Sequence, residues 1–97
     1  MDINMIMRQA QKMQADLKKT QSKLEATIYE GESNGIKIQI NGKCECQSIT
    51  IPEELMDDRE MLQDMLLIAF NNAVSKCDED REKQLGGLTA GLNLPGM

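Results

Sequence analysis

The chain has 97 residues, with 11 Lys and Arg against 16 Asp and Glu, no His, no Trp, one Tyr and one Phe. This length fits one domain, and so short a chain buries only a modest share of its surface, which makes a second copy an obvious source of further burial. The lack of His removes the usual proton shuttle and the commonest metal ligand. The net charge of −5 argues, at first sight, against a nucleic-acid partner.

Three cysteines, Cys44, Cys46 and Cys77, form an odd count that indicates reduced thiols in a cytoplasm. The first residues lack the basic region and apolar run of a secretory leader, and no stretch reaches the roughly 18 apolar residues of a membrane span. The C-x-C spacing of Cys44 and Cys46 places both on one face of a strand, but a zinc site usually needs about four ligands and no His is present. We interpret this pair as small strand side chains and expect neither a metal nor a cofactor.

A long helix is predicted over residues 4–24, which contain no Gly or Pro and are rich in helix formers. Its apolar positions alternate at spacings of three and four, the seam of a helix that lies along a partner helix. The seam consists of Ile3, Ile6, Ala10, Met13, Leu17 and Leu24, with Thr20 in the remaining position. Because the body is too small to cover so long a helix, part of it should project.

Three strands and two turns are predicted next. The strands cover residues 26–30, 36–40 and 43–51. The Asn-Gly dipeptide within the turn at 31–35 is a strong hairpin signal, and Asn41-Gly42 predicts the second turn. The alternation of the third strand changes phase between Cys46 and Ile49, which indicates a β-bulge.

A second helix is predicted to begin near Asp57 or Asp58, since Asp57 and Glu60 fit a capping box. It should end at Gln84 or Leu85, where Gly86-Gly87 would stop it. Its apolar stripe is wide enough to cover one face of a sheet. The stripe comprises Leu62, Met65, Leu66, Ala69, Phe70, Ala73, Val74 and Cys77.

The order of elements predicts an α+β fold, α-β-β-β-α, in which a three-stranded antiparallel meander carries the second helix on one face. We expect one domain over residues 1–87 and a flexible tail over 88–97. The edges of so small a sheet invite pairing with another chain.

No Gly-rich phosphate loop and no His-based catalytic group is present in the sequence. The carboxylates cluster at the start of the second helix and at residues 78–80, a pattern typical of solvated helix surface. We therefore expect neither enzymatic activity nor a small-molecule substrate.

The first helix carries its basic residues in a narrow stripe. At about 100° per residue, the stripe spans roughly 60° and extends about 22 Å along the axis. It comprises Arg8, Lys12, Lys19 and Lys23. Its centre lies roughly 130° from the seam. Lys18 falls outside the stripe, and Asp16 lies near one edge.

Charge is divided unevenly along the chain. Residues 1–24 have a net charge of +3, whereas residues 44–97 have −7. Because fields at protein surfaces act over about 8–10 Å at physiological salt, a basic arm on an acidic body can still meet a polyanion. The absence of aromatic residues from the arm favours contact with duplex phosphates over stacking on single-stranded bases.

Two other interpretations of the arm remain open. The lysines are equally compatible with an ordinary solvated helix face. Alternatively, the chain is a protein–protein interaction module that uses the seam and the acidic second helix and has no direct role with DNA.

Several stretches of the sequence, in this order and spacing, are specific, and Ala69-Phe70-Asn71-Asn72-Ala73 is the most specific of them. It is similar to the A-F-N-D-A of the YbaB/EbfC family of bacterial nucleoid-associated proteins, which the sequence resembles along nearly its whole length, although Asn72 stands where Asp is frequent. The other matching stretches are Arg8–Gln14, Gly31-Glu32-Ser33, Asn41-Gly42, Glu60-Met61-Leu62 and Gly91–Gly96.

The resemblance implies a tweezer-like homodimer whose long helices grip double-stranded DNA, with a role in chromosome organisation and transcription and a location in the cytoplasm at the nucleoid. It implies no cofactor, no metal, no membrane and no catalysis. The phosphate contacts implied for this chain are Arg8, Lys12, Lys19 and Lys23, with Lys18 as a weaker candidate. The loop at Glu32–Gly35 looks shorter than the glycine-rich loop of the family.

Overall fold

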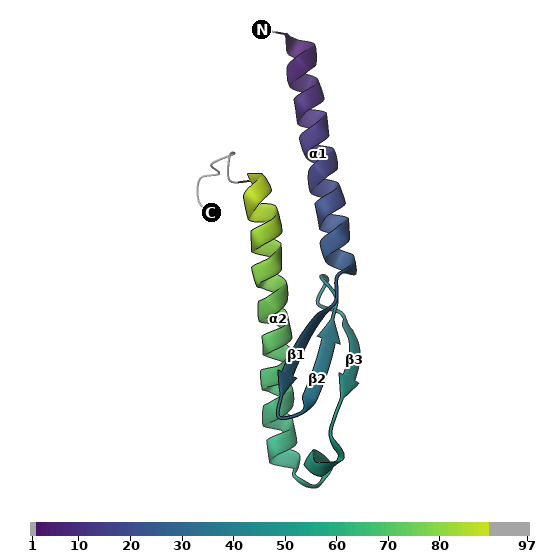
Figure 1. Cartoon of the computed structure of the whole chain (residues 1–97), viewed down its shortest axis with the longest axis vertical. Helices are drawn as coiled ribbons and strands as arrows, with labels where there is room; N and C mark the ends of the chain where they lie inside the picture. Colours follow the sequence, from purple (N-terminus) through teal and green to yellow (C-terminus); the bar gives the residue numbers. More distant parts are fainter. Residues whose placement is uncertain (1, 90–97) are drawn as a thin grey trace.

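The computed structural model describes residues 2–89 and has an elongated shape, with extents of 70 × 25 × 13 Å. A long helix stands above a small sheet, and a second long helix lies along that sheet (Figure 1). The element order is α1, three strands, a short 3₁₀ helix and α2, which confirms the predicted α+β fold. Its radius of gyration is 19.2 Å, against about 12.5 Å expected for a compact chain of this length. The projecting helix accounts for this difference.

Helix α1 runs over Ile3–Ala26, slightly beyond the predicted bounds at both ends. Asp2 caps its start, where the Asp2 carboxylate accepts a hydrogen bond from the Asn4 backbone at 3.0 Å. The chain turns to extended backbone at Thr27, whose hydroxyl donates to the Lys23 carbonyl at 2.7 Å. Both ends of α1 therefore have local partners for their free backbone groups.

The sheet contains β1 (Tyr29–Ser33), β2 (Ile36–Ile40) and β3 (Cys46–Thr50) in that spatial order, with both pairs antiparallel. The Asn-Gly prediction is confirmed, because Asn34 and Gly35 alone join β1 to β2 and both have positive φ, 48° and 89°.

The predicted bounds of the first strand were wrong by three residues. Gly31, assigned to the turn, lies within β1 because its missing side chain lets the strand approach α2. A Cβ built on Gly31 would fall 1.9 Å from the carbonyl oxygen of Ala69.

The connection between β2 and β3 is longer than the predicted two-residue turn, so β3 begins at residue 46 and not at 43. Asn41 organises this loop, because its side-chain oxygen accepts hydrogen bonds from the backbones of Lys43 and Glu45. The register shifts between Gln39 and Ile40, which pair with Ser48 and Cys46 and leave residue 47 as an extra residue. The predicted bulge is thereby confirmed.

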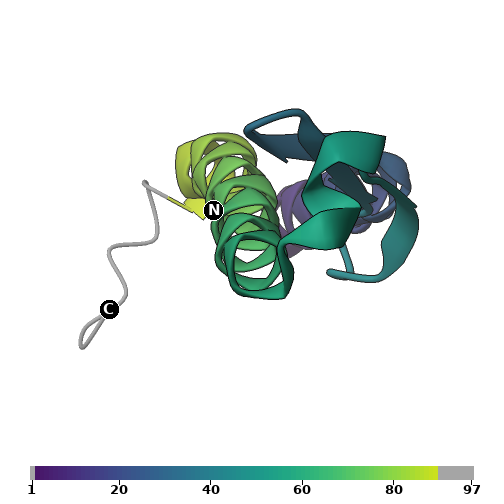
Figure 2. The same ribbon diagram turned by 90° about the horizontal axis from the view of Figure 1, so that it is seen from below.

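Helix α2 (Arg59–Thr89) packs against one face of the sheet, as the view along the long axis shows (Figure 2). Buried side chains of β1, β2, α2 and the 3₁₀ helix η1 (Glu53–Asp57) form the core. They are Tyr29, Ile36, Ile38, Ile40, Leu55, Ala69, Ala73 and Cys77. Helix α2 contacts β1 and β2 but not β3, so Ile49 stays 52% exposed although it pairs with buried Ile38.

The predicted start of the second helix near Asp57 or Asp58 is confirmed, whereas the capping box at Asp57 and the predicted end were wrong. The 3₁₀ helix occupies the residues before it, so the cap is Asp58 and not Asp57, and its carboxylate accepts from the Met61 backbone at 3.1 Å. Gly86-Gly87 does not stop α2, which continues to Thr89, because glycine tolerates a helix interior at a cost of about 1 kcal/mol. Two residues of the predicted tail therefore belong to α2, and residues 90–97 lie outside the described part.

Candidate nucleic-acid interface

Helix α1 leaves the body after a short junction. Every described residue from Asp2 to Asp16 is exposed, and the first side chains with partial burial are Leu17 and Thr20. Leu24 is the only buried residue of α1, at 5% exposure. More than half of the helix therefore presents its whole circumference to solvent, as the expected projection requires.

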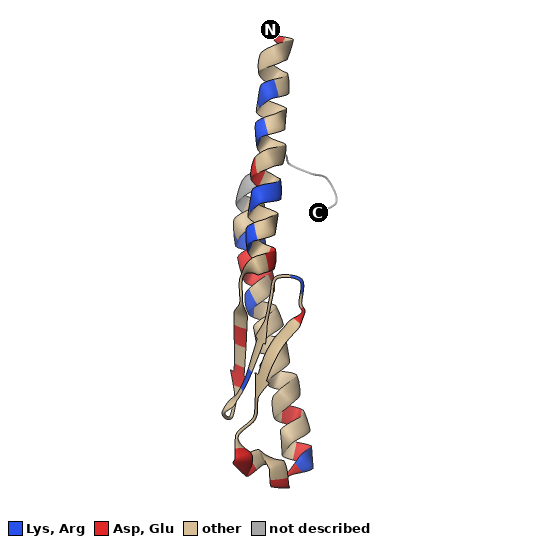
Figure 3. Ribbon diagram, turned by 90° about the vertical axis from the view of Figure 1, so that its right-hand side faces the viewer, with Lys and Arg blue, Asp and Glu red and all other residues tan. Residues whose placement is uncertain are grey.

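The five basic side chains of α1 are all exposed. Among residues 2–89, none of the five forms an ion pair, and the ion pair that the fold does contain joins Arg81 to Asp78 within α2. Figure 3 shows basic positions recurring along the projecting helix. Because no carboxylate of the described chain neutralises them, these cations are free to meet an external anion.

The opposite end of the molecule is acidic (Figure 3). Glu53, Glu54 and Asp57 lie on η1, and Asp58 and Glu60 lie at the start of α2, all of them exposed. These acidic residues therefore lie at the other end of the 70 Å axis from the start of α1, whereas Asp80, in the later part of α2, lines the same pocket as Lys23. At physiological salt the Debye length is about 8 Å, so the acidic end does not cancel the field around the arm.

The seam residues divide into two groups. Leu24 is buried and Leu17 is half-buried, whereas Ile3 is 70% exposed and Ile6 and Met13 are 47% and 43% exposed. Ala10 is exposed as well. Helix α2 thus covers only the end of the seam that lies nearest the sheet.

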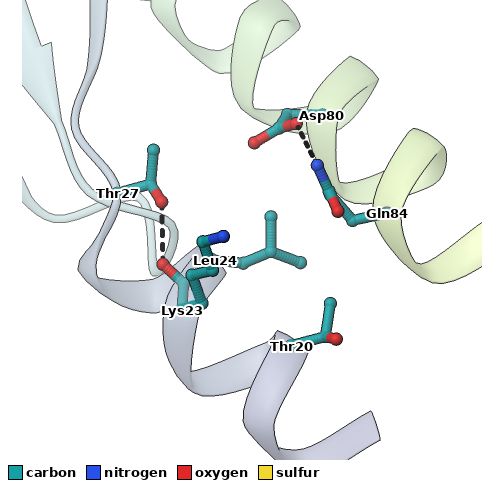
Figure 4. A pocket seen from close by; sticks show the side chains of 6 residues that line it. All are labelled: Thr20, Lys23, Leu24, Thr27, Asp80 and Gln84. Atoms are coloured by element: carbon teal, nitrogen blue, oxygen red, sulfur yellow. Dashed lines mark hydrogen bonds between the residues drawn. The ribbon is translucent and has the colours of Figure 1, made fainter. Parts of the chain in front are cut away.

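The junction of α1 with the body is a small pocket between the two helices, with a volume of about 30 Å³. Thr20, Leu24 and Thr27 approach it from the α1 side, and Asp80 and Gln84 approach it from α2 (Figure 4). The Gln84 amide donates to the Asp80 carboxylate at 3.4 Å. Lys23, at the end of the basic stripe, also lines this pocket.

A hydrogen bond from Tyr29, on β1, also stabilises this junction. The Tyr29 hydroxyl donates to the Asp80 carboxylate at 2.6 Å, a charge-assisted bond between β1 and α2. Burial of the ring, and then this bond to Asp80, raise the pKa of Tyr29 to about 12. The phenol at this junction is therefore neutral at neutral pH.

Sequence reasoning missed this junction. Tyr29 and Asp80 are 51 residues apart, and only the packing of α2 on β1 brings them together. The same packing places Arg81 against the Gly42 carbonyl. Neither pair belongs to a motif; the one signal available is that a buried Tyr usually finds a hydrogen-bond partner for its hydroxyl.

The described part of the chain offers no cluster of metal ligands. No group of three or more Cys, Asp and Glu side chains in residues 2–89 is arranged to hold a metal ion. Cys44 lies in the loop before β3 and has a positive φ of 64°, whereas Cys46 opens β3, so the two do not share a strand. The interpretation of both as strand side chains was therefore wrong for Cys44.

None of the described helices is long and apolar enough to cross a membrane.

A small α+β body with a projecting basic helix makes this chain a candidate nucleic-acid-binding protein. Comparison with known sequences identifies its family. The sequence model of the YbaB/EbfC DNA-binding family matches residues 1–92. The chain belongs to this family, as its resemblance predicted.

Named relatives agree with this assignment, and a solved structure shares the fold. A nucleoid-associated protein of Clostridium novyi (strain NT) is 43% identical over 101 residues, which cover 100% of this chain and 89% of that protein. A nucleoid-associated protein of Rickettsia prowazekii (strain Madrid E) is 39% identical over 98 residues, covering 97% and 92% of the two chains. The crystal structure of an uncharacterized protein from Helicobacter pylori has the same fold, with a TM-score of 0.76 at 23% identity, covering 91% of this chain and 97% of that one.

Proposed function

We propose that this protein binds duplex DNA as a homodimer, mainly through phosphate contacts made by the basic stripe of α1. The observation that carries the proposal is the stripe itself: Arg8, Lys12, Lys19 and Lys23 are exposed on a helix that projects from an acidic body, and none of them forms an ion pair within residues 2–89. The stripe is about 22 Å long, comparable with about six base pairs of B-DNA. Lys18 is a weaker contact on the flank of the stripe.

Phosphate contact is the binding mode that these side chains suit best. Lys and Arg side chains neutralise phosphates and position a protein on the duplex without reading its sequence. The arm holds no aromatic side chain that could stack on bases. Binding should therefore depend strongly on salt and only weakly on base sequence.

A second copy of the chain would cover apolar side chains that the single chain leaves exposed. Ile3, Ile6 and Met13 are exposed along the seam, and Ile49 is exposed on β3 next to the open edge of the sheet. Isolated helices are marginal in water unless an apolar face packs against a partner, so a free arm of this length gains from dimerisation. Two arms would double the number of phosphates in contact.

The biological setting follows from the family and its named relatives. Proteins 43% and 39% identical to this chain are called nucleoid-associated proteins. We infer that this chain acts at the nucleoid in the cytoplasm, organises the chromosome and affects transcription. Its role requires no catalysis, cofactor or membrane.

The test is duplex binding by a charge-neutral stripe variant. Changing Arg8, Lys12, Lys19 and Lys23 to Gln should abolish retardation of duplex DNA at low salt. A matched control changes four basic residues of the body, Lys37, Lys43, Arg59 and Lys83, to Gln; it removes the same charge and should still bind. Equal loss in both variants would show that total charge matters and that the stripe does not.

The exposed seam also favours a second function, that of a protein–protein interaction module. On this hypothesis, changing Ile6, Met13 and Leu17 to Ser removes a protein partner, while the stripe variant keeps it. The mass of each variant in solution must be measured in parallel, since the seam changes also threaten the dimer. Normal duplex binding by the stripe variant would favour this second function.

A further inference from the structure

The loop of residues 41–45 contacts both the last turn of α1 and helix α2. Gly42 is its point of contact with both helices. A Cβ built on Gly42 would lie 2.0 Å from the Leu24 carbonyl oxygen in the last turn of α1. On the other side, the Gly42 carbonyl accepts hydrogen bonds from Arg81 and, at 3.8 Å, from the Cys77 thiol of α2. A change in this loop therefore acts on the base of the projecting arm.

The same loop carries a second thiol, that of Cys44. The Cys44 backbone donates to the Asn41 carbonyl at 3.0 Å, which closes a tight turn and brings residue 44 back beside Gly42. Cys44 adopts φ of 64°, an unusual conformation for a residue with a side chain. Since Gly42 is in contact with Cys77, this turn brings the exposed Cys44 next to the buried Cys77.

The electrostatics of Cys77 agree with this placement. Burial raises the pKa of the Cys77 thiol, and Arg81, whose Nη2 lies 3.7 Å from the sulfur, opposes that effect. The Cys44 side chain also raises the pKa of the Cys77 thiol, through its charge and through hydrogen bonding. Cys46, by contrast, is exposed on β3, and its thiol contacts the Ser48 carbonyl at 3.8 Å.

We propose that Cys44 and Cys77 are a modification site, at which a hydroperoxide converts the two thiols into an intramolecular disulfide. Exposed Cys44 is the thiol that reaches the oxidant, and buried Cys77 resolves the product. The bond links the 41–45 loop covalently to α2. It thereby restrains the last turn of α1, because Gly42 of the loop packs against the Leu24 carbonyl. Nothing in the proposed DNA binding requires this site.

The chemistry balances with hydrogen peroxide as oxidant. The Cys44 thiolate attacks one peroxide oxygen, the O–O bond breaks, and Cys44 sulfenic acid and hydroxide form; the hydroxide takes up the thiol proton to give water. The Cys77 sulfur then attacks the Cys44 sulfur, the S–O bond breaks, and a second water leaves with the Cys77 proton. Two thiols lose two electrons, and one peroxide is reduced to two waters.

The test uses the full chain, reduced and then treated with hydrogen peroxide. Remaining thiols are alkylated, and the protein is digested with trypsin and a glutamyl endopeptidase. Cleavage after Glu45 separates Cys44 from Cys46, so mass spectrometry identifies the bonded pair directly. We expect a Cys44–Cys77 peptide from the monomeric chain, and a mass loss equal to two hydrogens in the intact protein.

Cys46→Ser is the matched control, because it removes an exposed thiol from the same region and should leave the cross-link intact. Cys44→Ser should abolish it while far-UV circular dichroism shows an unchanged fold. A Cys44–Cys46 bond, an intermolecular bond, or irreversible oxidation of Cys44 with Cys77 still reduced would each overturn the proposal. DNA binding is not measured, so the result is independent of the proposed function.

Discussion

Gly31→Ala tests the closest contact between the sheet and α2. A Cβ at residue 31 would fall 1.9 Å from the Ala69 carbonyl oxygen, 2.5 Å from the Ala73 nitrogen and 2.9 Å from the Ala73 Cβ. Two of the three atoms are backbone atoms of a helix, so no side-chain rotation relieves the overlap. The Ala69 oxygen would have to retreat by roughly 1.5 Å to reach ordinary contact.

The energetic cost arises because this movement of the Ala69 oxygen separates α2 from β1. Ala69, Ala73 and Ile36 are all 0% exposed, so moving α2 away from β1 opens the most tightly packed layer of the core. Overpacking of this kind costs about 1–3 kcal/mol where side chains can adjust, and more where backbone must move. We expect a loss of about 3 kcal/mol or more, out of the 5–15 kcal/mol typical of a domain. The corresponding fall in melting temperature is about 12–24 °C.

Urea denaturation followed by far-UV circular dichroism measures this loss. Gly86→Ala is the matched control, since no atom lies within 4 Å of the added Cβ and the residue is inside α2. It should stabilise the protein by about 0.5–1 kcal/mol because alanine favours the helix. If Gly31→Ala unfolds at the same urea concentration as the unmodified protein, the packing of α2 on β1 described here is incorrect.

Further predictions concern the junction and the start of α2. Tyr29→Phe should cost about 1.5 kcal/mol at pH 7, because Asp80 loses a charge-assisted hydrogen bond of 2.6 Å; an unchanged urea midpoint would refute that bond. Since the pKa of Tyr29 is raised from 10.0 in the unfolded chain to about 12 in the folded protein, its contribution is complete below pH 10 and is lost as the pH rises through 12. At about 1.4 kcal/mol for each unit of pKa, roughly 2–3 kcal/mol should disappear over this range, and Tyr29→Phe should lack this part of the alkaline loss in parallel urea titrations. Asp58→Ala should cost about 1 kcal/mol as a lost helix cap while Asp57→Ala costs little, and the reverse order would restore Asp57 as the cap.

Local patterns predicted most of the fold. The absence of Gly and Pro over residues 4–24, the strict alternation of residues 36–40 and the Asn-Gly turn each depend on short-range preferences that packing did not override. The bulge before Ile49 was also readable, because an extra residue necessarily changes the phase of the alternation.

The errors arose where tertiary contacts decide the outcome. Gly31 looked like a turn residue because its use as a contact point for α2 is invisible in sequence. Gly86-Gly87 looked like a stop, but a glycine pair ends a helix only when it adopts left-handed backbone, and here it continues α2. The contacts of Cys77 with the 41–45 loop, likewise, depend on the packing of α2 alone.

The residues of the candidate interface could be predicted from the sequence. How the rest of the fold surrounds them could be predicted only in part. Helical spacing placed Arg8, Lys12, Lys19 and Lys23 in one stripe, and the structure finds all four exposed. The sequence did not reveal how much of α1 the body covers, which depends on where α2 ends and how it meets Leu24. It also gave no sign of the Tyr29–Asp80 bond that fixes the root of the arm.

If the stripe of α1 binds duplex phosphates, duplex affinity must depend on salt, and titrations at several salt concentrations measure this dependence. If each of two arms neutralises three to four phosphates, the logarithm of the association constant should fall against the logarithm of salt concentration with a slope of about −5 to −7. Restoring Arg8 and Lys12 alone to the stripe variant should recover about half of that slope. A flat salt response of the unmodified protein would show that the stripe does not bind duplex phosphates.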